Sequence, residues 1–389
     1  MREIPLSVPN LNIEIADNLR ECIETGWVST GGRFISEFEE KVAKYTKVQA
    51  AIGCQSGTAG LHTALRILGV SAGDEVIVPT LTFIAAVNPV RYLDANPIFI
   101  DCDDTFCMDT KKLARFCAEE CHLECEQLIN NKTGAIVRAI VPVHIFGNLA
   151  DMEAIMEIAN EYHLKVLEDA TEAMGSFWSE GKYSGMHAGT VGDMGVFSFN
   201  ANKIITTGGG GMIVSKNKEY LEEASYLTTT AKDDGLYFAH DEIGYNYRML
   251  NLQAALGVSQ IDELDDFIKI KTRNYLRYKE NLSKLSGVKV MPFMKNIRSN
   301  HWFYSVLIED DNSCSESKRN RLMHALIEKG IQCRPIWKLV HTQKSYQQYQ
   351  AYDIETAIFY EGHVLNLPCS TNLSEEDVDY ICDKINELI

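Results

Sequence analysis

The sequence lacks a long hydrophobic run, a cluster of basic residues and any pair of cysteines spaced as CxxC. No apolar stretch approaches the roughly 20 residues of a membrane-spanning helix, and the first residues lack the apolar core of a signal peptide. The formal net charge is −17, which argues against nucleic acid as a partner. We therefore expect a cytoplasmic protein that binds neither membrane nor nucleic acid.

The chain has 11 cysteines, an odd number that is best explained by reduced thiols. One group of residues resembles a metal site in its spacing: Cys117, Cys121, His122 and Cys125. Residues 109–130 are expected to be helical, which would put the three cysteines on one helix face. Cys117 and Cys125 would then lie roughly 12 Å apart along the axis, too far to share one metal ion. We expect a half-buried helix face and no metal.

The length and composition indicate a globular protein of two parts. The chain has 389 residues, of which 46% are hydrophobic and 23% are charged, and it is longer than one ordinary core supports. We expect a large cofactor-binding domain over residues 1–250, with an N-terminal segment that is free to pack elsewhere. A smaller C-terminal α+β domain is expected over residues 251–389, beginning with a long helical stretch.

Strands and helices alternate through the first part of the chain. Strands are expected at 51–53, 75–79, 97–101, 135–143 and 165–169, with helical segments between them. This alternation predicts an α/β fold with a mainly parallel sheet, in which ligands bind at the carboxyl ends of the strands. Residues able to contact a ligand lie at or just beyond these ends: Ser56, Gly57, Thr58, Phe83, His144 and Asp169.

One stretch, which begins at the end of a further buried strand near Phe197, contains a lysine in a setting typical of reactive lysines. Ser198 lies between Phe197 and Phe199, Lys203 follows after a turn, and four glycines leave room for the backbone beside it. A lysine held on such a turn, next to a hydroxyl that can bind phosphate, is what a Schiff-base cofactor requires. The alternative is a surface lysine in a polar loop.

The candidate residues together suit an aldehyde cofactor that carries a phosphate and a pyridine nitrogen. Lys203 can form the imine, and Asp169 can pair with the protonated ring nitrogen. The phosphate and the ring face need further contacts, which the sequence offers in Gly57, Thr58, Ser198 and Phe83. Structural roles stay open for several of these residues: a helix cap for Ser56 or Asp169, and a core position for Phe83.

Ordered segments over nearly the whole chain resemble the DegT/DnrJ-type sugar-nucleotide aminotransferases. These are pyridoxal-phosphate enzymes of fold type I, so the resemblance implies a mainly parallel seven-stranded sheet between helices. The segments that carry it are Trp27–Gly32, Ser56–Thr58, Gly73–Pro79, Thr82-Phe83, Glu168–Ala170, Phe197–Lys203, Gly208–Gly211, Gly244–Arg248 and Arg334-Pro335 with His341.

The resemblance assigns roles to individual residues. It implies that Lys203 forms the internal aldimine and shuttles the proton, that Asp169 contacts the ring nitrogen, and that Glu172 lies on the other side of the cofactor. It further implies that the cofactor phosphate is bound by Ser56, Gly57, Thr58 and Ser198, and that Phe83 stacks on the cofactor ring. Asn246 matches a residue that reaches a phosphate across a dimer interface, which implies a homodimer with shared sites. Thr171 departs from the smaller residue that is commoner at its position.

The substrate is predicted from a second set of residues. The segment from Arg334 to His341 resembles the subgroup that acts at C4 of UDP-linked 4-keto-6-deoxy-N-acetylhexosamines. We therefore expect a UDP-linked substrate, although GDP-perosamine synthases share much of this pattern. The residues expected to bind it are Ser29, Thr30, Arg334, Trp337, Lys338 and His341. Trp337 could instead pack within the small domain.

The predicted reaction moves an amino group from glutamate to C4 of the keto-sugar, by ping-pong kinetics through pyridoxamine phosphate. A branch of the family has histidine in place of the lysine and dehydrates sugars, so Lys203 favours amino transfer. The alternatives are a GDP-perosamine-type or 3-amino-sugar aminotransferase, a dehydratase on the same cofactor, and a binding protein without activity.

Overall fold

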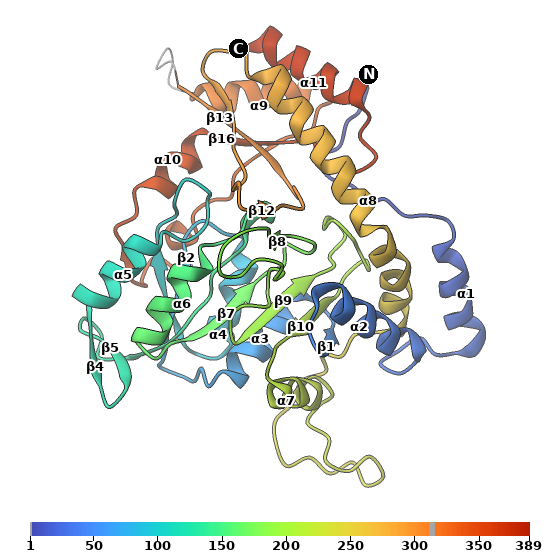
Figure 1. Cartoon of the computed structure of the whole chain (residues 1–389), viewed down its shortest axis with the longest axis vertical. Helices are drawn as coiled ribbons and strands as arrows, with labels where there is room; N and C mark the ends of the chain where they lie inside the picture. Colours follow the sequence, from blue (N-terminus) through green and yellow to red (C-terminus); the bar gives the residue numbers. More distant parts are fainter. Residues whose placement is uncertain (1, 311–315) are drawn as a thin grey trace.

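A ten-stranded sheet forms the centre of the protein (Figure 1). The computed structural model describes residues 2–310 and 316–389. The strands of the main path follow the order β1-β10-β9-β7-β6-β2-β3-β15. Neighbouring strands are parallel from β9 to β15, whereas β10 runs antiparallel to both β1 and β9. The predicted mainly parallel α/β sheet is confirmed, but it has ten strands and not seven. The additional strands are the edge strand β15, from the C-terminal part, and the hairpin of β4 and β5, which lies off the main path.

The strands of the large sheet are short and mostly buried. Their bounds are β1 Ala51–Cys54, β2 Glu75–Pro79, β3 Asn96–Ile100, β6 Ile136–Ile140, β7 Lys165–Asp169, β9 Met194–Ser198, β10 Gly211–Val214 and β15 Ala351–Tyr352. Every residue of β2 and β9 is buried, as expected for strands covered by helices on both faces. The helices of this part are α2 Arg33–Thr46, α3 Gly57–Ile67, α4 Asn88–Tyr92, α5 Thr110–Glu119, α6 Met152–Glu161 and α7 Lys218–Thr228.

The helix expected over residues 109–130 is only half present. α5 ends at Glu119, and the chain then forms a hairpin of β4 (Cys121–Glu124) and β5 (Gln127–Asn130). Cys125 and Glu126 take positive φ angles of 49° and 61° at its turn. Cys117, Cys121 and Cys125 therefore do not share a helix face. Within residues 2–310 and 316–389, no group of three His, Cys, Asp or Glu side chains could hold a metal ion.

As a group, the apolar residues near the start of the chain are only partly buried. α1 runs over Ile15–Thr25 and buries Ile15 and Cys22, whereas Leu11 and Ile23 are exposed. The following helix, α2, buries Phe38 and Val42 fully. The apolar residues of the first segment therefore do not all face the core of this chain.

The C-terminal part has its own sheet, in the order β11-β13-β16-β14. Its elements are α8 Asn251–Leu282, β11 Val288–Val290, β13 Tyr304–Ile308, α9 Lys318–Glu328, β14 Arg334–Pro335, α10 Thr356–His363, β16 Val364–Leu367 and α11 Glu375–Leu388. α8 extends from α1 and α2 to α11 (Figure 1). The N-terminal segment joins this part, since Ile4 exchanges backbone hydrogen bonds with Gly330 and Gln332. The domain boundary at residue 250 stays a prediction.

Two expectations about the whole chain can be compared with the described residues. No helix among them is long and apolar enough to cross a membrane. The cysteines among them are free thiols, and all but Cys125 are buried. Burial raises the pKa of Cys54 and Cys107 to about 12, so these thiols stay protonated.

Candidate active site

A cavity of about 640 Å³ opens at the carboxyl ends of the central strands. It lies where β7 and β9 end and α3 begins, and loops of the C-terminal part close it. Its lining includes most of the residues that the sequence assigned to the cofactor: Ser56, Gly57, Thr58, Phe83, Asp169, Glu172, Ser198 and Lys203. The prediction that these residues converge on one site is consistent with this placement.

Lys203 reaches the cavity from the turn that follows β9. Its backbone N–H donates to the carbonyl of Asn200 at 2.9 Å, which closes the turn. Burial lowers the pKa of Lys203, and the charges of Glu172 and Asp169 partly oppose this shift. The lysine is therefore easier to deprotonate than an exposed one, as a proton-accepting amine requires.

Two carboxyl groups face the lysine from the end of β7. An Asp169 oxygen accepts from the backbone N–H of Thr171 at 3.0 Å, and a Glu172 oxygen accepts from that of Phe146 at 2.8 Å. Burial raises the pKa of Asp169, and it raises the pKa of Glu172 to about 7. An incoming cationic ring nitrogen would therefore stabilise the ionised form of Asp169.

The beginning of α3 can receive an anion. The Ser56 hydroxyl accepts from the N–H of Ala59 at 3.1 Å, so the predicted helix cap is present. A side chain at Gly57 would approach the side chains of Ser198 and Thr171 to 3.0 Å. Glycine thus keeps a small space at the N-terminus of α3 into which first-turn N–H groups point, the arrangement that binds phosphate.

Aromatic and basic side chains also line the cavity. Phe83 is 52% exposed at the cavity, so a core role for it is wrong. Its ring centroid lies 6.0 Å from that of Trp337, which also contacts Phe146 at 4.8 Å. Arg334 and Lys338 line the same cavity. Stacking of Phe83 on a cofactor ring stays a prediction.

Four predicted site residues do not line this cavity. His341 contacts the Thr80 hydroxyl at 2.6 Å through Nδ1, and burial lowers its pKa. Ser29, Thr30 and Asn246 are exposed on the surface of this chain. A role for the last three in the active site of a partner chain stays a prediction.

The cavity also contains residues that the sequence analysis missed. Trp302 and Phe303 contribute from the loop before β13, and Asn366 contributes from β16. The Nζ atom of Lys203 lies 4.0 Å from the centroid of the Trp302 ring. No motif marks position 302, since an aromatic residue before a buried strand is typical of a core.

His144 and Glu168 form a fully buried pair behind the site. Ala150 N–H donates to His144 Nδ1 at 3.1 Å, so Nε2 carries the proton and donates to Glu168 at 2.8 Å. Glu168 also accepts three backbone N–H groups, from Gly189, Val191 and Gly192, at 2.6–2.9 Å. Four donors thus surround one carboxylate, which fixes the strand end that carries Asp169.

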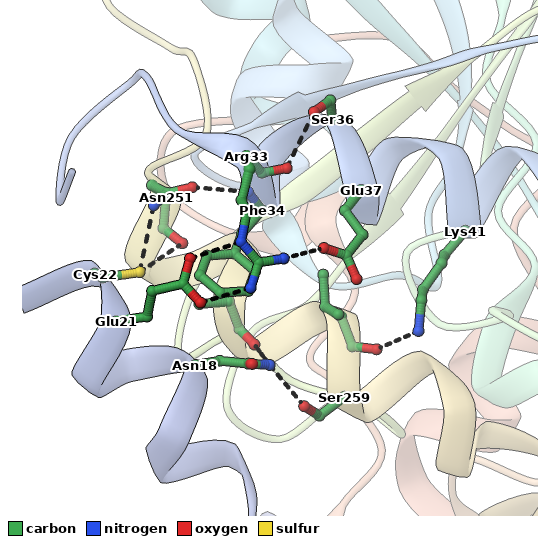
Figure 2. Close-up of polar contacts among 12 residues, drawn as sticks. Asn18, Glu21, Cys22, Arg33, Phe34, Ser36, Glu37, Lys41, Asn251 and Ser259 are labelled. Carbon is green, nitrogen blue, oxygen red and sulfur yellow. Dashed lines mark hydrogen bonds and ion pairs between the residues drawn. The ribbon is translucent and has the colours of Figure 1, made fainter. Parts of the chain in front are cut away.

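The exposed loop with Ser29 and Thr30 is held by Asn251 at the start of α8. Figure 2 shows Asn251 in contact with Phe34 and Cys22. The Asn251 side chain accepts from the N–H of Phe34 at 3.1 Å and donates to the carbonyl of Trp27 at 2.7 Å. Its backbone N–H donates to the carbonyl of Ser29 at 2.7 Å. A side chain at Gly32 would overlap Asn251. The loop is therefore preorganised.

Replacing Asn251 by alanine is expected to destabilise the protein by about 3 kcal/mol, because the buried N–H of Phe34 and the part-buried carbonyl of Trp27 lose their partners. Asn18→Ala is the matched control. Its side chain bonds Ala255 and Ser259 in the same network, but it is only partly buried. We expect a loss of about 1 kcal/mol for that variant. Urea unfolding measures both, and equal losses would contradict a special role for Asn251.

The raised pKa of Glu172 predicts a pH dependence of stability. The folded protein keeps a proton on this group up to pH about 7, whereas an unperturbed glutamate releases it near 4.5. The stabilisation from that proton is complete below pH 4.5 and is lost as the pH rises through 7. Relative to Glu172→Gln, the cofactor-free wild type should lose unfolding free energy across this window. If the unfolding free energies of the two proteins changed equally with pH, the raised pKa of Glu172 would be contradicted.

The residues of the cavity fit pyridoxal phosphate. A buried lysine of lowered pKa, a carboxyl group that a cationic ring nitrogen would ionise and an anion-binding helix N-terminus line one space. Together with the fold, these features define a pyridoxal-phosphate-dependent aminotransferase. A model of the DegT/DnrJ/EryC1/StrS aminotransferase family matches residues 9–386, and the chain belongs to this family.

Three relatives illustrate the similarity. The chain is 39% identical to a GDP-perosamine synthase of Escherichia coli O157:H7, over 100% of this chain and 99% of that protein. It is 34% identical to the putative pyridoxal phosphate-dependent aminotransferase EpsN of Bacillus subtilis, over 97% and 93%. A crystal structure of a family aminotransferase from Brucella abortus is 27% identical, with a TM-score of 0.86 over 96% and 94%.

These findings confirm the predicted enzyme class, cofactor and fold. The preference for a UDP-linked substrate is wrong: GDP-perosamine synthases from three bacteria are among the relatives, each aligned over nearly its full length. The segment from Arg334 to His341 misled the prediction because both subgroups share much of its pattern.

Proposed function

We propose that this enzyme transfers an amino group to C4 of a GDP-linked 4-keto-6-deoxy sugar and so makes a GDP-perosamine-type product. The observation that carries this proposal is the 39% identity to a GDP-perosamine synthase over the whole chain. We further propose that glutamate is the amino donor, that the enzyme acts as a homodimer and that it works in the cytoplasm.

The composition of the cavity supports a nucleotide sugar as substrate. Arg334 and Lys338 supply positive charge beside the lysine and the buried acids, in a protein whose net charge is −17. A diphosphate needs such local cations, because the overall field of the protein repels it. Trp337 and Phe83 offer flat apolar surface for a sugar or base.

The protein contributes proton transfer and orientation to the reaction. Pyridoxal phosphate, when bound, supplies an electron sink for the carbon that loses its proton. Lys203 takes up and returns that proton at Nζ, a role that its lowered pKa favours. Asp169 would hold the ring nitrogen, and the first turn of α3 with Ser198 would hold the phosphate. Trp302 and Phe303 give this end of the cavity an apolar lining.

The homodimer is supported by residues that this chain leaves exposed. Asn246, Ser29 and Thr30 do not line the cavity of their own chain. The segment after α7 extends away from the body of the molecule (Figure 1) and exposes Leu236, Tyr237, Phe238 and Ile243. Apolar side chains this exposed, next to Asn246 in the sequence, favour a second copy as their partner.

Mass spectrometry of products from paired GDP- and UDP-linked 4-keto-6-deoxy sugars tests the substrate. With glutamate present, we expect the GDP-linked sugar to be converted to a 4-amino product, with one 2-oxoglutarate released for each amine formed. Preference for the UDP-linked sugar, an amine at C3, or loss of water without 2-oxoglutarate would each contradict the proposal.

Mixing two inactive variants tests the shared site. Lys203→Ala lacks the amine, and Asn246→Ala lacks the group proposed to reach the partner's phosphate site. A mixed dimer would contain one site with both residues intact. We expect activity to return when the two proteins are unfolded and refolded together, and not when they are merely mixed at the end of the assay. No recovery would contradict the contribution of Asn246 across the interface.

A further inference from the structure

Trp302 and Lys203 come from distant parts of the chain, and the lysine amine lies over the face of the indole in the cavity. The Nζ atom of Lys203 lies 4.0 Å from the centroid of the Trp302 ring. A cation within about 6 Å of an indole face is attracted by the negative charge density of the ring. The indole thus offers the amine a contact that neither accepts its proton nor reacts with it.

The ring of Trp302 is held from both its side chain and its backbone. Its Nε1–H donates to the carbonyl of Asn202, the residue before the lysine, at 2.8 Å. Its backbone N–H donates to the carbonyl of Phe146 at 3.0 Å, and its carbonyl accepts from Lys271 Nζ at 3.1 Å. The side chain is buried, with 3% exposure. The indole therefore keeps its orientation toward Lys203.

The other groups that face the amine are the two carboxyl groups already described. Glu172 and Asp169 favour the charged amine, and burial disfavours it. Asp169 is assigned to the ring nitrogen and Glu172 bonds the N–H of Phe146. Among the described residues of the cavity, the ring face of Trp302 is a third contact that favours the ammonium form of Lys203. Unlike the two carboxyl groups, the indole does not itself gain or lose a proton.

We propose that Trp302 is a positioning residue that holds the amine of Lys203 whenever this amine is free and stabilises its protonated state during amino transfer. The inference rests on the proposed function. In each half-reaction the neutral amine takes one proton from one carbon, becomes an ammonium ion over the indole and delivers the proton to another carbon; the carbon of the amino donor loses a proton, and C4 of the keto-sugar gains one. Charge and protons therefore balance over the half-reaction.

Fluorinated tryptophan at position 302 tests this directly. Analogues with one to four fluorines on the benzene ring keep the shape and the N–H donor, but they progressively remove the negative charge of the ring face. The full-length enzyme is prepared with its cofactor in the amine form, so that Lys203 is free. Competitive acetylation over a pH series, read by peptide mass spectrometry, then gives the pKa of Lys203.

We expect the pKa of Lys203 to fall stepwise with each fluorine, by about one unit over the series. The same analogues at Trp337, which lines the same cavity without contacting the amine, should leave this pKa unchanged. A flat series at position 302, or equal shifts at both positions, would overturn the proposal. The readout needs no sugar substrate, so an error in the proposed sugar would not affect it.

Discussion

Lys203→Ala should lower the rate of amino transfer on the order of 10⁴-fold, because the variant loses the group that takes up and returns the proton. Stability should change little or improve, since the buried amine carries a desolvation cost that also lowers its pKa. The rate is measured by single-turnover reaction with glutamate, followed at the absorption band of the bound cofactor.

Lys203→Arg is the matched control. It retains a cation beside Trp302, but guanidinium does not lose its proton in proteins and cannot serve as a base. We expect it to be as inactive as the alanine variant. A small primary amine added to Lys203→Ala should restore part of the rate, because it can carry the proton from solution. Activity near that of wild type in either variant would contradict the assignment.

Asp169→Asn and Glu168→Gln should have opposite effects, although the two residues are neighbours at the end of β7. Burial raises the pKa of Asp169, so the ionised group is costly in the cofactor-free protein. Its amide analogue should leave the unfolding free energy unchanged or increase it. Amino transfer should nevertheless fall on the order of 10²- to 10³-fold, because the ring nitrogen loses a preorganised charge.

Glu168→Gln should instead lower the unfolding free energy by about 3 kcal/mol. The four groups around Glu168 all donate, so the new amide N–H₂ must face at least one of them without an acceptor. Denaturant unfolding and single-turnover rates on the same preparations separate the two variants. If Asp169→Asn unfolds as easily as Glu168→Gln, Asp169 is a structural residue and the account of the ring nitrogen is wrong.

The part of the site nearest the sheet could be predicted because it depends on local sequence. Ser56-Gly57-Thr58 joins a strand to a helix, and Asp169 ends a buried strand, so both must lie at the carboxyl edge of a parallel sheet. Lys203 follows the neighbouring strand by a short turn. Periodicity and turn residues fix such positions without knowledge of distant contacts.

The elements that depend on distant contacts could not be predicted in this way. Trp302 reaches the lysine through a loop whose course is set by Phe146, Lys271 and Asn202. The sequence of the β4–β5 hairpin has apolar residues at spacings that also fit a helix. Its pairing with β6, a contact distant in sequence, favours the strands over the helix. His341 matched a substrate-binding motif but is held by Thr80. Tertiary contacts decide each of these positions.

The central claim is that Lys203 holds pyridoxal phosphate in the cavity beside Asp169. Borohydride reduction of the resting enzyme makes the bond between cofactor and lysine permanent, and peptide mass spectrometry then locates it. We predict one pyridoxyl-phosphate group per chain, on the peptide that contains Lys203, and its absence after the same treatment of Lys203→Ala. Modification of a different lysine, or no modification of an enzyme that transfers amino groups, would contradict the account.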